Sequence, residues 1–286
     1  MRDPSVAYRE VRRQTEQAAY VARPWIAWWG RVGYAAHGVV YGLMGILALQ
    51  AALGIGGDIT DSEGVLLRII AAPFGRVLLG SIAVGLVGYA TWRFIQAGFD
   101  TEHKGTDLQG LLARGTYGVS GVIHLGVALF AVGLLRGTAP ESGGGDQTAA
   151  DRTAWLLTWP FGPWLVALVG AVVIGAGLVQ LYKAYRADFH DELDLSAMSR
   201  TERLWAVRAG RLGCVARGIV FGVVGGFLIV AAIQADPGQA RGIGGALATL
   251  AQEPAGPWLL GVVALGLMAF GCFELVEARF GRIVVS

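Results

Sequence analysis

Six apolar segments, each long enough to cross a lipid bilayer, limit the folds open to this chain. They lie at about residues 32–53, 75–96, 115–135, 161–182, 212–233 and 257–277. A hydrocarbon core of about 30 Å needs roughly 20 residues of helix, because each residue adds about 1.5 Å. The composition agrees, since 54% of the residues are hydrophobic and only 15% are charged. The sequence therefore predicts an all-α membrane protein with six transmembrane helices.

A short motif occurs three times, at the start of each odd-numbered apolar segment. Its fullest form, Arg-x-Gly-Tyr-x-x-x-Gly-x-x-Tyr, spans residues 31–41, and related versions span 114–124 and 211–221. Proline followed two residues later by glycine precedes each even-numbered segment, which suits a turn into a helix N-terminus. These turns lie at 73–75, 160–162 and 254–256. The chain is therefore a triplicated helical hairpin.

Three hairpins that enter the membrane from the same side are parallel repeats, related by an axis along the membrane normal. We therefore expect a pseudo-threefold bundle. Short amphipathic helices on the membrane surface are predicted near 64–72, 149–159 and 244–252. The domain prediction is an N-terminal segment, 1–29, followed by one membrane domain, 30–286. Its repeats span about 30–100, 113–187 and 210–282.

The N-terminal segment has the pattern of a short amphipathic helix over residues 5–22, with Arg9, Arg12 and Arg13 opposite its apolar face. Such a helix can contact anionic lipids or pack on its own protein, and both interpretations stay open. Apart from Arg217, which lies within the fifth span, 17 Lys and Arg residues fall on the side of the two termini and 5 on the other side. The positive-inside rule then predicts that both termini are cytoplasmic.

The three motif copies, each followed by Pro-x-Gly and a second span, resemble the bacterial DUF1206 family of six-helix membrane proteins. The resemblance covers nearly all of residues 30–280, with departures at Thr116, Ser120, His124 and Cys214. It implies the fold and a multi-pass location in the bacterial plasma membrane.

Superposing the repeats aligns polar residues within the membrane. Tyr34, His37 and Tyr41 share one helix face. The candidate polar pocket comprises these residues and their counterparts: Tyr34, His37, Tyr41, Arg93, Tyr117, Ser120, His124, Gln180, Arg217 and Glu274. A charge at a helix centre costs roughly 2.5–3.5 kcal/mol on insertion scales, so such residues normally face the bundle interior and find partners. We expect an Arg217–Glu274 ion pair. The layer is either a cytoplasm-facing pocket or proton path, or a set of structural cross-links.

Cofactors are not expected. His37 and His124 lie six and ten residues beyond their repeat arginines, about 6 Å apart in height, which argues against haem ligation by the pair. The loop 188–194 contains acidic residues and His190, but its spacing matches no metal motif. Glycines repeat at 38, 42 and 45 and at 218, 222 and 225. This spacing indicates close helix packing, with a lipid groove as the alternative.

Three functions remain open. The absence of a nucleophile with a positioned base predicts no enzyme activity. A structural or accessory subunit is the leading hypothesis, with a protein partner on the glycine faces or the basic N-terminal helix. The alternative is binding or transport of a small molecule, ion or lipid in the polar pocket, and a cofactor-binding redox bundle is the third. The lipid bilayer is the expected surrounding, and nucleic acid is not an expected partner.

Overall fold

The computed structural model describes residues 4–101, 105–139, 145–187, 189 and 192–281. Six of its helices are long and apolar enough to cross a membrane. These spans lie in α1 (Pro4–Ala52), α3 (Gly75–Phe99), α4 (Leu108–Arg136), α6 (Gly162–Arg186), α7 (Arg200–Gln234) and α9 (Gly256–Phe280). Three shorter helices, α2 (Ser62–Ala71), α5 (Gly145–Leu157) and α8 (Ile243–Gln252), precede the even-numbered spans. The predicted all-α architecture is confirmed.

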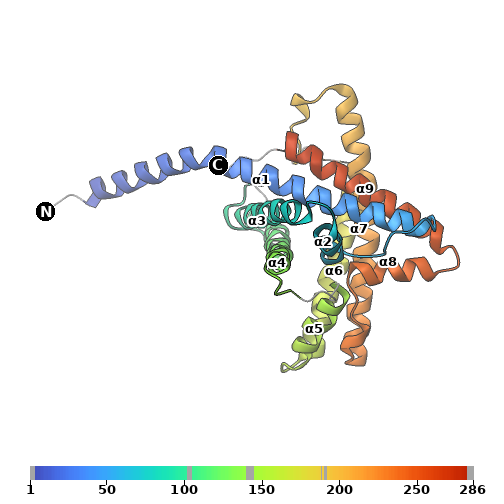
Figure 1. The fold of residues 1–286 in the computed structure, drawn as a ribbon. Coiled ribbons are helices and arrows are strands. Elements are labelled where there is room, and N and C mark those ends of the chain that lie inside the picture. The colour runs from blue at the N-terminus through green and yellow to red at the C-terminus, as the bar shows by residue number, and fades with distance from the viewer. Residues whose placement is uncertain (1–3, 102–104, 140–144, 188, 190–191, 282–286) are drawn as a thin grey trace.

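The N-terminal segment and the first span form one continuous helix. Helix α1 runs without interruption from Pro4 to Ala52, through Pro24, and its first half projects from the bundle (Figure 1). A proline removes one helical hydrogen bond but does not by itself end a helix that continues on both sides. The side chains of residues 1–24 lie outside the described ones, so lipid contact by this segment stays a prediction.

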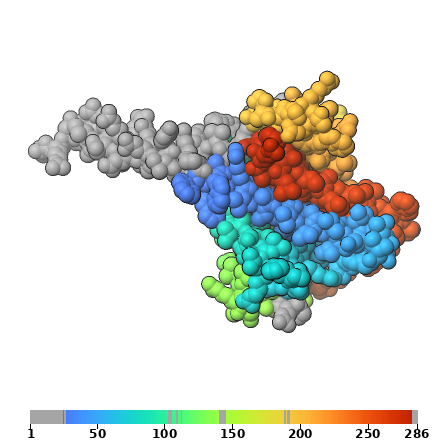
Figure 2. Space-filling model, turned by 45° about the horizontal axis from the view of Figure 1, so that its top comes forward, coloured from blue at the N-terminus to red at the C-terminus, as the bar shows by residue number. Residues whose placement is uncertain are grey.

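The repeats are arranged in a ring with one open side. The second span of each repeat packs on the first span of the next: α3 on α4, α6 on α7, and α9 on α1. Within the first and third repeats the two spans also pack together, and Figure 2 shows α1 between α9 and α3. The two spans of the middle repeat, α4 and α6, do not pack on each other. The pseudo-threefold ring is therefore open between α4 and α6.

The repeat arginine explains how consecutive repeats join. Arg114 donates to the carbonyls of Ala97 at 2.8 Å and Gly98 at 2.9 Å, at the end of α3. Arg211 donates in the same way to Ala184 at 3.0 Å, near the end of α6. The last carbonyls of a helix have no partner within it and carry partial negative charge, so a guanidinium stabilises them.

Small residues in the motif allow the close helix contacts, and their loss explains the opening. A Cβ atom on Gly33 would lie 2.4 Å from the Tyr89 backbone nitrogen, and one on Gly213 would lie 2.6 Å from the Phe270 Cα atom. The middle repeat has Thr116 at this position, and Thr116 is exposed. Larger side chains replace the small ones where α4 and α6 would otherwise meet.

A second set of contacts shows the same difference. A Cβ atom added to Gly85 would lie 2.4 Å from the Cβ atom of Ala36, and one added to Gly266 would lie 2.4 Å from the Cβ atom of Ala216. The corresponding residues of the middle repeat are Val172 and Val119, which are 49% and 52% exposed. The opening between α4 and α6 is therefore encoded in the sequence.

The Pro-x-Gly turns place a glycine against the preceding helix. Added Cβ atoms on Gly75, Gly162 and Gly256 would lie 2.1, 2.6 and 2.0 Å from carbonyl oxygens of α2, α5 and α8. No side chain fits at such a distance, which accounts for the glycine in all three turns.

The short helices α2, α5 and α8 meet at the opposite end of the bundle from the repeat arginines. Asp61 accepts a hydrogen bond from the Gly64 amide at 3.0 Å and caps α2. Asp146 in α5 accepts from the amides of Gly242 at 2.7 Å and Gly245 at 2.9 Å, at the start of α8. Asp146 thus joins α5 to α8 through backbone N–H groups, and the Thr148 hydroxyl of α5 donates to Glu63 of α2 at 2.9 Å.

Burial raises the pKa of Asp61. The folded protein then holds this proton more tightly than the unfolded chain does. Stability is therefore greatest below the ordinary Asp pKa of about 3.9 and falls as the pH rises through the raised value. Asp61→Asn keeps an acceptor oxygen but does not titrate. As the pH rises through this range, we expect the melting temperature of Asp61→Asn to fall less than that of the wild type in thermal scans. If the two melting temperatures change with pH in parallel, Asp61 is not the titrating group.

Candidate intramembrane site

A chain of polar contacts crosses the centre of the bundle. His37 on α1 and His124 on α4 meet with their Nε2 atoms 2.8 Å apart. On one side, His124 Nδ1 lies 2.7 Å from the backbone carbonyl oxygen of Ser120. On the other side, His37 Nδ1 lies 3.0 Å from Glu274 Oε2 on α9, and both side chains are at most 2% exposed. Four polar groups from three helices thus form one chain.

Two expectations about these polar residues were wrong. His37 and His124 were expected to lie at different heights, but their side chains meet. Helix α4 is steeply inclined to α1 (Figure 1), so the position of a residue along its helix does not give its depth in the bundle. Glu274 contacts His37 rather than Arg217, and no ion pair joins Arg217 to Glu274 among the described residues.

The separation of the two histidines is that of a hydrogen bond. Two imidazole nitrogens bound to one tetrahedral metal ion would lie about 3.3 Å apart, at roughly 2.0–2.1 Å per bond. In the part of the chain that the structure describes, no group of three His, Cys, Asp or Glu side chains could hold a metal ion. The absence of haem and metal stays a prediction.

Arg93 on α3 is held by tyrosines and an amide. Its guanidinium donates to Tyr89 Oη at 2.6 Å and to Gln96 Oε1 at 2.9 Å. It also lies over the rings of Tyr89, Tyr34 and Tyr117, at 4.8, 5.6 and 5.5 Å. Cation–π contacts of this kind compensate a desolvated cation in part.

Arg217 on α7 is held differently. Its guanidinium lies over the rings of Phe270, Phe221 and Tyr41, at 4.3, 5.0 and 5.4 Å. No described residue accepts a hydrogen bond from it, and its Nε atom is buried without a partner. A guanidinium has five N–H donors, and burying donors without acceptors is costly. Arg217 therefore has the capacity to bind an acceptor that the described chain does not supply.

The structure brings nine of the ten predicted pocket residues into this layer. The exception is Gln180, which is half-buried on α6 and makes no hydrogen bond, ion pair or ring contact with the other nine among the described residues. Sequence reasoning missed Tyr89, Phe270 and Glu277. Glu277 is buried on α9. Glu277 lies one helical turn after Glu274. Polar residues occupy the same position in the other repeats, Gln96 after Arg93 and Lys183 after Gln180. The alignment of the repeats could therefore have identified Glu277 as part of the polar layer.

The layer is partly exposed on the side of the middle repeat. His124 and Ser120 on α4 and Arg217 on α7 are half-buried, whereas the aligned residues His37 and Tyr41 on α1 are buried. Since α4 and α6 do not pack together, the exposed side faces the opening between them. Apolar side chains on both helices flank it, each at least 49% exposed: Val119, Val122, Ile123, Val172 and Val179.

One protein family matches all three repeats. The family described as Domain of Unknown Function (DUF1206) matches residues 32–100, 115–187 and 212–281. The chain belongs to the DUF1206 family. The uncharacterized protein YxxB of Bacillus subtilis (strain 168) is 38% identical over 258 residues, which are 90% of this chain and 92% of that relative. No solved structure matches. All ten predicted pocket residues lie within the DUF1206 repeats.

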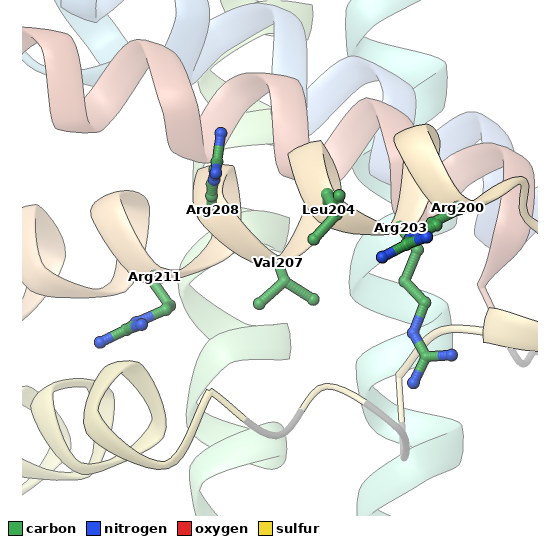
Figure 3. A pocket seen from close by; sticks show the side chains of 6 residues that line it. All are labelled: Arg200, Arg203, Leu204, Val207, Arg208 and Arg211. Carbon is green, nitrogen blue, oxygen red and sulfur yellow. The ribbon is translucent and has the colours of Figure 1, made fainter.

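A basic surface of this DUF1206 protein lies at the start of α7. A shallow pocket of about 430 Å³ is lined by Arg200, Arg203, Leu204, Val207, Arg208 and Arg211 (Figure 3). Figure 3 shows Arg208 turned to the opposite side of the helix from Val207 and Arg211. The guanidinium groups therefore point to different sides of α7 and do not form a closed site. Nearby Trp205 is 64% exposed, as is typical of a helix end at the membrane surface.

Proposed function

We propose that this protein binds an anionic amphiphile, a molecule with a carboxylate or phosphate head and an apolar tail, that reaches the polar layer from the bilayer. The supporting observation is Arg217, a guanidinium without an acceptor beside the opening between α4 and α6. Arginine is well suited to oxyanions because its N–H groups match two oxygens at once. The apolar flanks of the opening suit the tail.

The glycine faces argue against the accessory role that the sequence favoured. Four of the six glycines are engaged within the chain. Cβ atoms on Gly38 and Gly45 would lie 2.7 Å from carbonyl oxygens of α9, and those on Gly218 and Gly225 would lie 3.0 and 2.7 Å from carbonyl oxygens of α6. These faces are therefore occupied by intramolecular packing. On the glycine faces, only the positions of Gly42 and Gly222 leave room for an added side chain. The basic N-terminal helix, the other surface expected to receive a partner, lies outside the described side chains.

Binding is tested with decanoate, a carboxylate with one apolar chain, on protein in neutral-lipid nanodiscs. We expect decanoate to bind and to raise the melting temperature, while acetate and methyl decanoate at equal concentration have no effect. Arg217→Gln should remove the response, and Arg208→Gln, nine residues earlier on α7 and on its surface, should retain it. A response to acetate would point to a free-anion site. Equal responses to decanoate and its methyl ester, or none to decanoate, would refute the proposal.

We further infer a location in the bacterial plasma membrane, with both termini in the cytoplasm. The excess of Lys and Arg on the side of the termini and the relative in Bacillus subtilis support this assignment. In a variant without Cys214 and Cys272, a cysteine at position 239 should react with an impermeant maleimide on intact spheroplasts. A cysteine at position 200 should react only after lysis, and the reverse result would invert the topology.

A further inference from the structure

The polar chain has a definite number of protons, which follows from its acceptors. The carbonyl of Ser120 can only accept, so His124 Nδ1, 2.7 Å away, carries a hydrogen. A neutral His124 then has a lone pair on Nε2, and the proton shared across 2.8 Å belongs to His37 Nε2. A neutral His37 in turn presents a lone pair on Nδ1. The network assigns these tautomers.

The last contact of the chain requires one more proton. His37 Nδ1 and Glu274 Oε2 are 3.0 Å apart without the alignment of a hydrogen bond, and both atoms are buried with no hydrogen-bond partner. If His37 is neutral and Glu274 is ionised, two lone pairs face each other in a buried site. A single proton, on the carboxyl group or on the imidazole, removes this repulsion. The His37–Glu274 pair is therefore a site for one proton.

The charges around this pair relate the proton to an anion. Arg93 and Arg217 place two guanidinium groups in the same layer as the pair. Glu277 is a second buried carboxyl group of this layer, and Lys183 and Glu192 pair with each other and cancel. A proton on the His37–Glu274 pair makes the layer more positive by one charge. The proton therefore favours an anion at Arg217, and a bound anion favours the proton.

We propose that the protein takes up one proton on the His37–Glu274 pair for each anion bound at Arg217, so that proton and anion are ligands of one coupled site. This inference rests on the proposed function and adds the second ligand. Coupling is reciprocal: the factor by which a bound proton raises the affinity for the anion is the factor by which a bound anion raises the affinity for the proton. The uptake is electroneutral, which suits a site within the bilayer, where an uncompensated charge is expensive.

The test is isothermal titration of decanoate into the full-length protein in nanodiscs. Buffers of different ionisation enthalpy report the protons bound with the ligand. Above the pKa of the free pair, we expect about one proton per decanoate and about a tenfold rise in apparent Kd per pH unit. In Glu274→Gln, which is neutral at every pH, decanoate should bind with no proton uptake and with a Kd independent of pH.

The outcomes separate the two proposals. If the wild type binds decanoate without proton uptake at every pH, the coupling is refuted and the anion site stands. If Glu274→Gln retains the pH dependence of the wild type, the proton resides elsewhere and the assignment to this pair is wrong. If folded wild type, verified by its melting curve, binds no decanoate, both proposals fail. Glu253→Gln changes an exposed carboxyl at the end of α8, in the turn before α9. It is the control and should behave as the wild type.

Discussion

Gly213→Ala is expected to destabilise the protein more than a single methyl group suggests. The added Cβ would lie 2.6 Å from both Cα and Cβ of Phe270 and 2.9 Å from its backbone nitrogen. Backbone atoms cannot rotate away, so α7 and α9 must separate along their contact. Overpacking of a tight interface costs about 1–3 kcal/mol, and we expect the upper part of this range because the obstacle is main chain. The gain in helix propensity, about 1 kcal/mol, offsets only part of this cost.

Gly222→Ala is the matched control on the same helix. No atom lies within 4 Å of its added Cβ, so the substitution should leave stability unchanged or raise it slightly. Both variants would be unfolded by heat in the same detergent and monitored by circular dichroism. Equal melting temperatures for the two variants would show that α7 and α9 are not in the close contact described above.

Arg93→Met is expected to cost about 3–5 kcal/mol, because it removes two hydrogen bonds to a charged group and each contributes about 1.5–3 kcal/mol. The substitution leaves Tyr89 without its 2.6 Å partner and Gln96 without its 2.9 Å partner. It also removes a positive charge beside the buried carboxyl groups of Glu274 and Glu277. Methionine has similar length, so lost packing contributes little.

Arg241→Met is the control for this prediction. Arg241 also lies over an aromatic ring, that of Phe227 at 5.2 Å, but it is exposed, and exposed charge contacts contribute little. Unfolding of the purified variants should separate them clearly. If Arg93→Met has the same melting temperature as Arg241→Met and the wild type, the contacts of Arg93 do not stabilise the protein. A double variant, Arg93→Met with Glu277→Gln, should recover part of the loss.

The sequence predicted the fold because membrane insertion depends on properties that are local in the chain. Apolar length identifies each span, and the three Arg-x-Gly motifs and Pro-x-Gly turns show that one hairpin is repeated. The structure adds the reason for these residues: Arg114 and Arg211 bind the carbonyls that end the preceding span, and Gly75 lies against a carbonyl oxygen of α2. The motif residues that mark each repeat in the sequence are therefore the residues that make its conserved-geometry contacts in the structure.

The sequence also selected most of the site, since a polar residue in a span must find a partner inside the bundle. It did not identify the partners. Arg217 was assigned to Glu274 because the two lie in one hairpin, yet Glu274 contacts His37 of another repeat. Depth along a helix did not predict that His37 and His124 meet, because it ignores the inclination between helices.

What the sequence by itself determined is therefore the six spans, the threefold repetition and the membership of polar residues in one layer. Only the tertiary structure decided which polar atoms meet, and that the ring stays open between α4 and α6. The physical reason is that pairing depends on the angles between helices, which are set by packing along their whole length. Gly33, Ala36 and Gly85 lie where α1 packs closely on α3. The aligned residues of the middle repeat, Thr116, Val119 and Val172, are larger and predict the opening only when these contacts are known.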